Sequence, residues 1–189
     1  MLDTTYAVVS YLTGPIADFV SGLRRRLNPL YGDWLAHVSV LPPRILSWTV
    51  GDRDNRLAHL REQCRQIAPF EVALDGVSTF WPVNGVVYLS VAEGLAPLAE
   101  LHSLLNHNGM YSAEPYAYVP HVTVAQALDE AATQDALKEV SQAWAAVAKP
   151  IRFRVDSLVL VGQDVPGHWV DIAPIPLGSY SLSSRFQSI

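Results

Sequence analysis

The chain has 189 residues, half of them hydrophobic, and a net charge of −5, so it can bury a substantial core. Its mild acidity argues against a protein that coats long nucleic acids, because such proteins neutralise many phosphates with an excess of basic residues. The single cysteine, Cys64, excludes an intramolecular disulfide and a thiolate metal cluster. The N-terminal residues lack the pattern of a signal peptide or a membrane span, and we therefore expect a cytoplasmic protein without a membrane anchor.

The first fifty residues predict two strands separated by a helix. Residues 6–12 are β-branched and aromatic, as is typical of a strand, and Pro15 then stands where a helix can begin. The apolar face of that helix consists of Ile16, Phe19, Val20, Leu23 and Leu27. Residues 24–26, three arginines, are therefore expected to face solvent, although they could also guide RNA. Residues 37–41 predict a second short strand before Pro42 and Pro43.

The middle of the chain predicts helix, hairpin and helix. The second helix is marked by Leu57, Leu60, Cys64 and Ile67 and is closed by Pro69. Residues 70–77 and 86–91 are strand-like runs, and the Asn84-Gly85 pair between them is a strong signal for a tight turn. Leu98, Leu101 and Leu105 indicate a third helix.

The last third of the chain predicts a strand, a helix and a final strand pair. The strand spans residues 119–125, and the helix has Leu137, Val140, Trp144 and Val147 on one side. The strand pair is expected at residues 151–161 and 168–172, followed by a serine-rich tail at 177–189. The order of elements echoes itself, with a histidine-bearing strand in each half. We therefore expect a duplicated α+β architecture in one domain over residues 1–189, and a monomer.

Two segments stand out because they have the same pattern, His37-Val-Ser39-Val and His121-Val-Thr123-Val. On a strand, residues i and i+2 share a face, so each histidine and its hydroxyl residue point to one side while the valines point to the core. A single copy would most often be a hydrogen-bonded structural histidine. The repetition favours a site in which two imidazoles and two hydroxyls meet.

This set of side chains suits a phosphodiester. A neutral imidazole can take a proton from water or a ribose hydroxyl, and an imidazolium can protonate the departing oxygen. The hydroxyls of Ser39 and Thr123 would bind the non-bridging phosphate oxygens and stabilise the transition state. We therefore predict His37 and His121 as the catalytic pair, with no cofactor and no metal.

Two further residues near the motifs are candidates for substrate binding. Arg44 closely follows the first motif and could pair with a phosphate, although it could equally be a surface residue. Tyr118 precedes the second motif and could stack on a base. Arg152 and Arg154 share a strand face and could line a basic groove, which an exposed strand explains equally well.

The motifs and their surroundings resemble the two-histidine phosphoesterase superfamily, the group of 2′-5′ RNA ligases and cyclic phosphodiesterases. The similarity covers residues 5–172 and includes the opening Tyr6-Ala-Val-Val and the Phe80-Trp-Pro segment before a Val-Tyr-Leu strand. It implies a bilobal fold with pseudo-twofold symmetry, antiparallel sheets lining a central cleft and helices outside. It also implies catalysis by His37 and His121. Many members have a basic residue where this chain has Gln126.

The expected activity is that of a metal-independent phosphoesterase acting on a cyclic phosphate or a 2′-5′ linkage of RNA or a nucleotide. The sequence leaves open whether the reaction is hydrolysis or ligation, because these differ in whether water or a ribose hydroxyl attacks. The alternative is a module that binds RNA ends or nucleotides without turnover. A purely structural duplicated domain is a third possibility.

Overall fold

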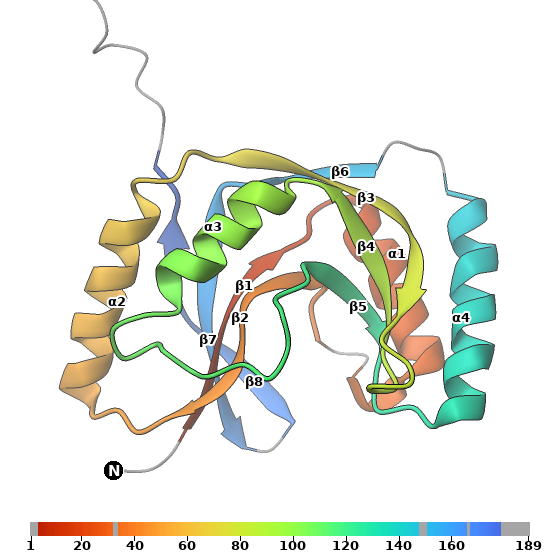
Figure 1. Ribbon diagram of the computed structural model, residues 1–189, viewed down its shortest axis with the longest axis horizontal. Helices are drawn as coiled ribbons and strands as arrows, with labels where there is room; N and C mark the ends of the chain where they lie inside the picture. The colour runs from red at the N-terminus through yellow and green to blue at the C-terminus, as the bar shows by residue number, and fades with distance from the viewer. Residues whose placement is uncertain (1–3, 32–33, 148–150, 166, 179–189) are drawn as a thin grey trace, which may run out of the picture.

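Two antiparallel sheets of four strands each form the centre of the molecule within the part that the computed structural model describes, residues 4–31, 34–147, 151–165 and 167–178 (Figure 1). Sheet A has the order β2-β1-β7-β8 and sheet B the order β5-β4-β3-β6. The strands of sheet A are β1 (Thr4–Tyr11), β2 (His37–Leu46), β7 (Ser157–Val165) and β8 (His168–Pro176). Those of sheet B are β3 (Phe70–Thr79), β4 (Val87–Glu93), β5 (His121–Ala125) and β6 (Ile151–Val155).

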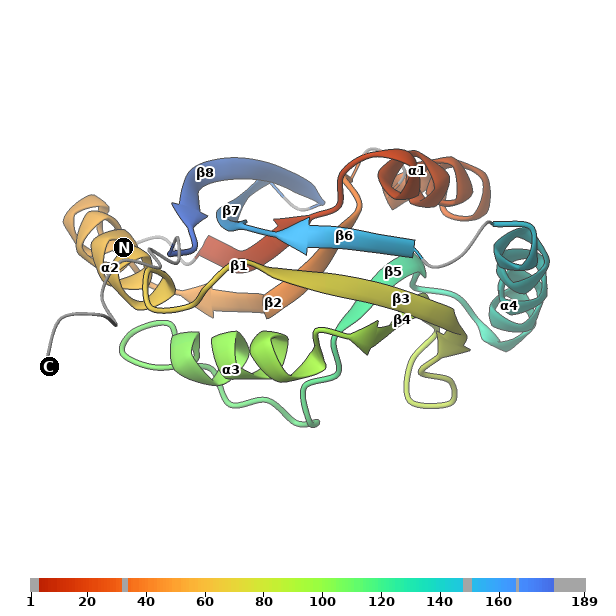
Figure 2. The same ribbon diagram turned by 90° about the horizontal axis from the view of Figure 1, so that it is seen from above.

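Four α-helices surround the sheets in the described ranges: α1 (Pro15–Leu27), α2 (Val50–Cys64), α3 (Leu95–Leu105) and α4 (Glu130–Ala145). A short 3₁₀ helix, Pro29–Tyr31, follows α1. Seen from above, α2 lies at one end of the pair of sheets and α1 and α4 at the other (Figure 2). Thr49 begins α2 with a capping box, in which its hydroxyl accepts from the Asp52 amide and the Asp52 carboxylate accepts from the Thr49 amide.

The two halves of the chain exchange their helices. α1 follows β1 of sheet A but packs on β5 of sheet B, and α3 follows β4 of sheet B but packs on β2 of sheet A. In each sheet the histidine-bearing strand is the edge strand, and its neighbour is the strand that precedes the exchanged helix. The sequence-based expectation of a duplicated, bilobal α+β fold with antiparallel sheets is therefore confirmed.

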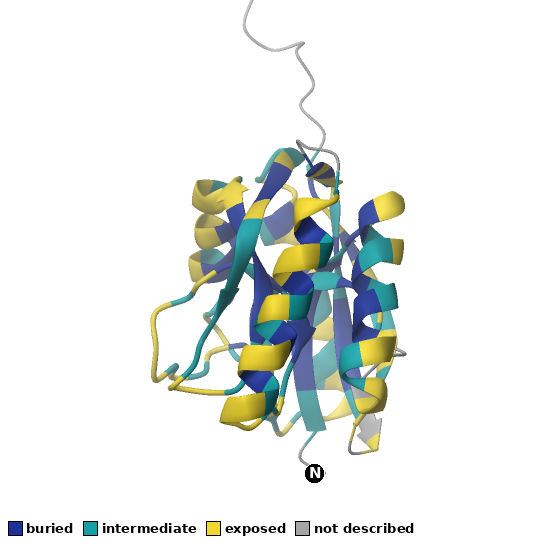
Figure 3. Ribbon diagram, turned by 90° about the vertical axis from the view of Figure 1, so that its right-hand side faces the viewer, coloured by how far each residue is buried: buried dark blue, intermediate teal, exposed yellow. Residues whose placement is uncertain are grey.

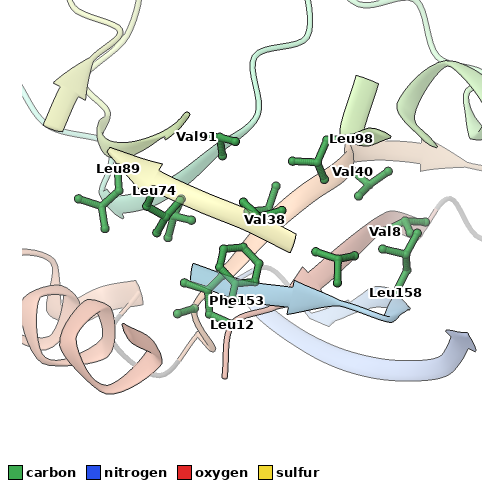
Figure 4. Packing of buried hydrophobic residues seen from close by; sticks show 14 of the residues in the cluster. Val8, Leu12, Val38, Val40, Leu74, Leu89, Val91, Leu98, Phe153 and Leu158 are labelled. Carbon is green, nitrogen blue, oxygen red and sulfur yellow. The ribbon is translucent and has the colours of Figure 1, made fainter. Parts of the chain in front are cut away.

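The core lies between the sheets and the inner faces of the helices (Figure 3). Burial alternates along the histidine strands and contributes to this core. Val38, Val40 and Val122 are fully buried, whereas the histidine and the hydroxyl residue of each motif are only half-buried. Figure 4 shows Val38 and Val40 in the same cluster as Leu74, Leu89 and Phe153 of sheet B. The valines thus fix the strands, and the opposite strand faces are left for the histidines and hydroxyls.

Two strand boundaries differ from those expected. β2 continues through Pro42 and Pro43 to Leu46, and an edge strand tolerates proline because its outer amides need no partner. Residues 151–161 do not form one strand. They divide at Asp156 into β6, which pairs with β3 of sheet B, and β7, which pairs with β1 and β8 of sheet A.

The predicted serine-rich tail at 177–189 lies largely outside the described residues. Its first two residues are held in place. Leu177 is buried and its amide donates to the Asp156 carbonyl, and the Gly178 amide bonds the carbonyls of Cys64 and Ile67.

A substitution at Gly85 can test how tightly the β3–β4 loop is packed. A Cβ at this position would lie 1.9 Å from the backbone oxygen of Leu128. We expect Gly85→Ala to lower the free energy of unfolding by about 2 to 3 kcal/mol, since backbone cannot move aside as a side chain does. Gly22→Ala is the matched control, because nothing lies near its Cβ within α1 and the helix should gain about 1 kcal/mol. Urea denaturation of both variants measures the difference, and equal stability would contradict the packing.

Candidate active site

The two histidine motifs meet where the edge strands of the sheets lie side by side. β2 and β5 are in contact, although they belong to different sheets. In sheet A, His37 pairs with Tyr11 and Ser39 with Val9. In sheet B, His121 pairs with Ser90 and Thr123 with Tyr88. The predicted face of each motif therefore opens on the junction between the sheets.

Both imidazoles are held by the same local contact. Nδ1 of His37 lies 2.7 Å from the carbonyl oxygen of Leu35, and Nδ1 of His121 lies 2.7 Å from that of Val119. A carbonyl can only accept, so in each neutral ring Nδ1 carries the proton and donates it. The Nε2 atoms remain as the groups that can exchange a proton with a ligand.

A cavity of about 620 Å³ contains both motifs. The predicted residues that line it are His37, Ser39, Tyr118, His121 and Thr123. Phe80, Val83 and Asn84 from the β3–β4 loop form another part of its wall. A second cavity, of about 430 Å³, lies over sheet A and shares His37 and Ser39 with the first. Small side chains, Ala7, Val9 and Val161, line this second cavity with Tyr11, Trp34, Trp169 and Asp171.

The electrostatic environment favours neutral imidazoles in the free protein. Burial lowers the pKa of His37 to about 4, and the positive charge of Arg24 adds to this effect. The hydrogen bond to Leu35 acts in the opposite direction, and the charge of His121 lowers the pKa further. Burial also lowers the pKa of His121, against the effect of its bond to Val119.

Aromatic rings pack on both imidazoles but differ between the halves. His121 contacts Phe80 and Tyr88, with ring centroids 5.0 and 5.1 Å away, and these two rings stack on each other. His37 contacts Tyr11 edge-on at 6.4 Å, and the Tyr11 hydroxyl donates to Asp171. Sequence analysis missed these neighbours. The strand register that places them depends on pairing between segments far apart in the chain.

Arg24 was predicted to face solvent, and this prediction is wrong. The residue is 3% exposed and lines the larger cavity. Its Nε and Nη2 donate to the Thr123 carbonyl at 2.9 and 2.6 Å, and its Nη1 donates to the carbonyls of Trp34 and Leu35 at 2.9 and 3.0 Å. The signal was present in the sequence, since Arg24 stands four residues after Val20 on the apolar face of α1.

Arg44 is not among the residues that line the two cavities. It is buried, and its guanidinium donates to Pro42, Asn106, Met110 and Glu114 at distances from 2.7 to 3.0 Å. These contacts show that Arg44 stabilises the loop before β5. To bind a phosphate, its N–H groups would have to face the cavity. Arg152 and Arg154 pair with Glu93 and Glu71 on an exposed strand face.

Tyr118 lies between that loop and the first motif. Its hydroxyl donates to the Ser39 carbonyl at 2.8 Å, and its ring stacks on His102 with centroids 4.0 Å apart. His102 in turn bonds the Val40 carbonyl and lies 3.3 Å from Glu114. Tyr118 therefore supports β2 at the same time as it lines the cavity.

Within the described ranges, no group of three or more His, Cys, Asp or Glu side chains could hold a metal ion. In the same ranges, no helix is long and apolar enough to cross a membrane.

Comparisons with known proteins identify the family and the fold of the chain. The family model described as the 2′-5′ RNA ligase superfamily matches residues 13–167. A protein of Bacillus licheniformis, named as a candidate phosphoesterase, is 32% identical over 133 residues, which are 70% of this chain and 76% of that protein. A relative with the same kind of name from Oceanobacillus iheyensis is 30% identical over 137 residues, with coverage of 70% and 76%.

Among solved structures, E. coli LigT has the same fold. Its apo form superposes with a TM-score of 0.63 at 16% identity and covers 95% of this chain and 100% of its own. The complex of LigT with 3′-AMP gives a TM-score of 0.64 at 16% identity, with coverage of 93% and 99%.

The structural role of Arg44 leads to a stability prediction. Arg44→Ala should lower the free energy of unfolding by about 3 kcal/mol, because it leaves Glu114 and the carbonyl of Met110 without their donor. Arg26→Ala removes an exposed pair with Glu139 and should cost about 0 to 1 kcal/mol. Thermal and urea denaturation provide the measurement. A fully stable Arg44→Ala variant with weakened phosphate binding would instead support the role first predicted from the sequence.

Proposed function

The chain belongs to the 2′-5′ RNA ligase superfamily, and on that basis we propose that it is a phosphoesterase acting on a cyclic phosphate or a 2′-5′ linkage of RNA or a nucleotide. The observation that supports this best is the matched pair of imidazoles at one cavity. Each Nδ1 is tied to a carbonyl and each Nε2 is left for proton transfer. The 3′-AMP bound by LigT is a nucleotide ligand of the same fold and supports a nucleotide substrate here.

The geometry supports concerted acid-base catalysis. In hydrolysis, one neutral imidazole takes a proton from water as the oxygen bonds to phosphorus, and the other, protonated, gives its proton to the departing ribose oxygen. If a ribose hydroxyl attacks a cyclic phosphate in place of water, the new bond to phosphorus is a 2′-5′ linkage, and the ring oxygen that departs takes the proton. Ser39 and Thr123 lie two residues along the same strand faces and line the same cavity. Their hydroxyls would donate to the non-bridging oxygens as charge develops there.

The two histidines should be equally necessary. We expect His37→Ala and His121→Ala each to reduce kcat about 10²- to 10⁴-fold, because each removes one of two concerted proton transfers. The double variant should be no worse than the poorer single variant. The measurement is turnover of 2′,3′-cyclic nucleotides, 2′-5′ oligonucleotides and ADP-ribose cyclic phosphate in EDTA.

His59→Ala, on the exposed side of α2, is the control and should leave turnover unchanged. Loss of all activity in EDTA with recovery in zinc or manganese would contradict the mechanism. Tight nucleotide binding without turnover of any of these substrates would identify a binding module.

The pH dependence follows from the lowered pKa values. The productive free enzyme has one proton on the pair, so kcat/KM should be bell-shaped with a slope near one on each side. Below the bell both imidazoles are charged and the base is lost, and above it both are neutral and the acid is lost. The pKa of His37 is about 4 and that of His121 is below its ordinary value of 6.5, so the bell for kcat/KM should lie on the acidic side of neutrality.

The bell for kcat should lie at higher pH than the bell for kcat/KM. A bound phosphate diester is negatively charged and raises the pKa of both imidazoles in the complex. Initial rates from pH 3 to 9 on a cyclic phosphate substrate measure both profiles. A kcat/KM that rises to a plateau and stays flat into alkaline pH would contradict the use of a histidinium acid.

A further inference from the structure

Each imidazole in the site donates to a backbone carbonyl in the same way, but the hydroxyl residues of the two motifs differ in the group that donates to their own carbonyls. The carbonyl of Ser39 on β2 accepts from a neutral phenol, the hydroxyl of Tyr118. The carbonyl of Thr123 on β5, which stands at the matching place of the other motif, accepts from the guanidinium of Arg24. A duplicated site thus receives one fixed positive charge, on one side only.

Arg24 is also joined to the His37 side of the site. Its Nη1 donates to the carbonyl of Leu35, and this is the same oxygen to which Nδ1 of His37 donates. The cation and the imidazole therefore share one acceptor. The four bonds of Arg24 use four of the five N–H groups of a guanidinium, so the side chain is held in one orientation.

The charge of Arg24 is not neutralised by these bonds, because all of their acceptors are carbonyl oxygens. Burial lowers the pKa of Arg24 to about 10, which still leaves it charged at neutral pH. The charge of Arg24 therefore acts on neighbouring titratable groups with little screening. His37 is such a neighbour, and Arg24 contributes to its lowered pKa, whereas only burial lowers the pKa of His121.

Besides Arg24, the titratable groups that line the two cavities with His37 are Tyr11, Glu114, Tyr116, Tyr118, His121, His168 and Asp171. His121 approaches from β5, and Tyr11 approaches from β1 with its hydroxyl bonded to Asp171 of β8. Burial and the Asp171 carboxylate raise the pKa of Tyr11, so this residue stays neutral. Arg24 is then the only fixed positive charge in this set.

We propose that Arg24 is a positioning residue that makes the two histidines inequivalent, keeping His37 neutral so that the single proton of the pair resides on His121. Under the proposed function, on which this consequence rests, His37 is the base and His121 the acid in hydrolysis. Water loses its proton to His37 as its oxygen bonds to phosphorus. The bond from phosphorus to the ribose oxygen breaks, and that oxygen takes the proton of His121.

The test is an NMR titration of the histidine rings in the substrate-free chain, with the signals assigned from His37→Gln and His121→Gln. In the wild-type chain, His37 should titrate at lower pH than His121. In Arg24→Met, the midpoint of His37 should rise by about one pH unit, a tenfold change in its proton affinity, and that of His121 should move much less. Arg24→Lys keeps the charge and should keep the midpoint of His37 low.

Tyr118→Phe is the matched control. It removes the corresponding bond to the Ser39 carbonyl without a change of charge, and both midpoints should stay near their wild-type values. If Arg24→Met raised the midpoint of His37 only by loosening the strands, Tyr118→Phe should raise it as well, and the proposal would be wrong. A folded Arg24→Met variant with an unchanged His37 midpoint would also overturn it.

The wild-type titration remains decisive if Arg24→Met does not fold, because a His37 that titrates above His121 excludes the proposal by itself. In active enzyme, the acidic limb of the kcat/KM profile should move to higher pH in Arg24→Met and stay in place in Arg24→Lys. The titrations need no turnover. A chain that binds nucleotides without hydrolysing them would refute the proposed function, while the order of the two midpoints would still decide this inference.

Discussion

Arg24 joins the two halves of the molecule beside the two histidine strands. The candidate site depends on the position of these strands relative to each other. Its side chain begins on α1 and bonds the carbonyl of Thr123 on β5 as well as those of Trp34 and Leu35 just before β2. The two histidine strands are edge strands of different sheets, so no backbone ladder joins them. A buried guanidinium with carbonyl acceptors on both sides supplies a fixed spacing that apolar packing alone would hold less precisely.

The duplicated topology explains why two distant segments form equivalent sites, and the differences between the halves show where they have diverged. Beside sheet B, Phe80 of the β3–β4 loop and Tyr88 of β4 stack together against His121 and occupy the space next to it. In sheet A, the small side chains of Ala7 and Val9 leave a second cavity beside His37. The two imidazoles are therefore matched in local geometry but open on unequal surroundings.

Much of the fold and of the site could be predicted from local patterns. The period of two along the histidine strands placed His37 with Ser39 and His121 with Thr123, because that rule depends only on backbone geometry. The division at Asp156 could not be predicted in this way, since it depends on the strands with which the two parts pair, β3 for the part before Asp156 and β1 for the part after it. Arg44 follows a motif closely in sequence, but three of the residues that accept from it, Asn106, Met110 and Glu114, lie far along the chain. Arg24 bonds carbonyls, which every residue has, so its partners leave no trace in the sequence.

The lowered pKa values of the histidines are compatible with catalysis when the charge of the substrate is considered. A buried imidazole beside Arg24 is poorly suited to hold a proton in the free protein, because no negative charge compensates it. Under the proposed function, a phosphodiester would bring that compensation. Its negative charge in the cavity would favour the protonation of one imidazole as it binds. The free site therefore has the positive charge of Arg24 on one side. A negatively charged ligand would offset this charge and so favour the protonated imidazole that proton transfer needs. The same arrangement would favour an anionic substrate, since a neutral ester would not stabilise the protonated imidazole through its charge.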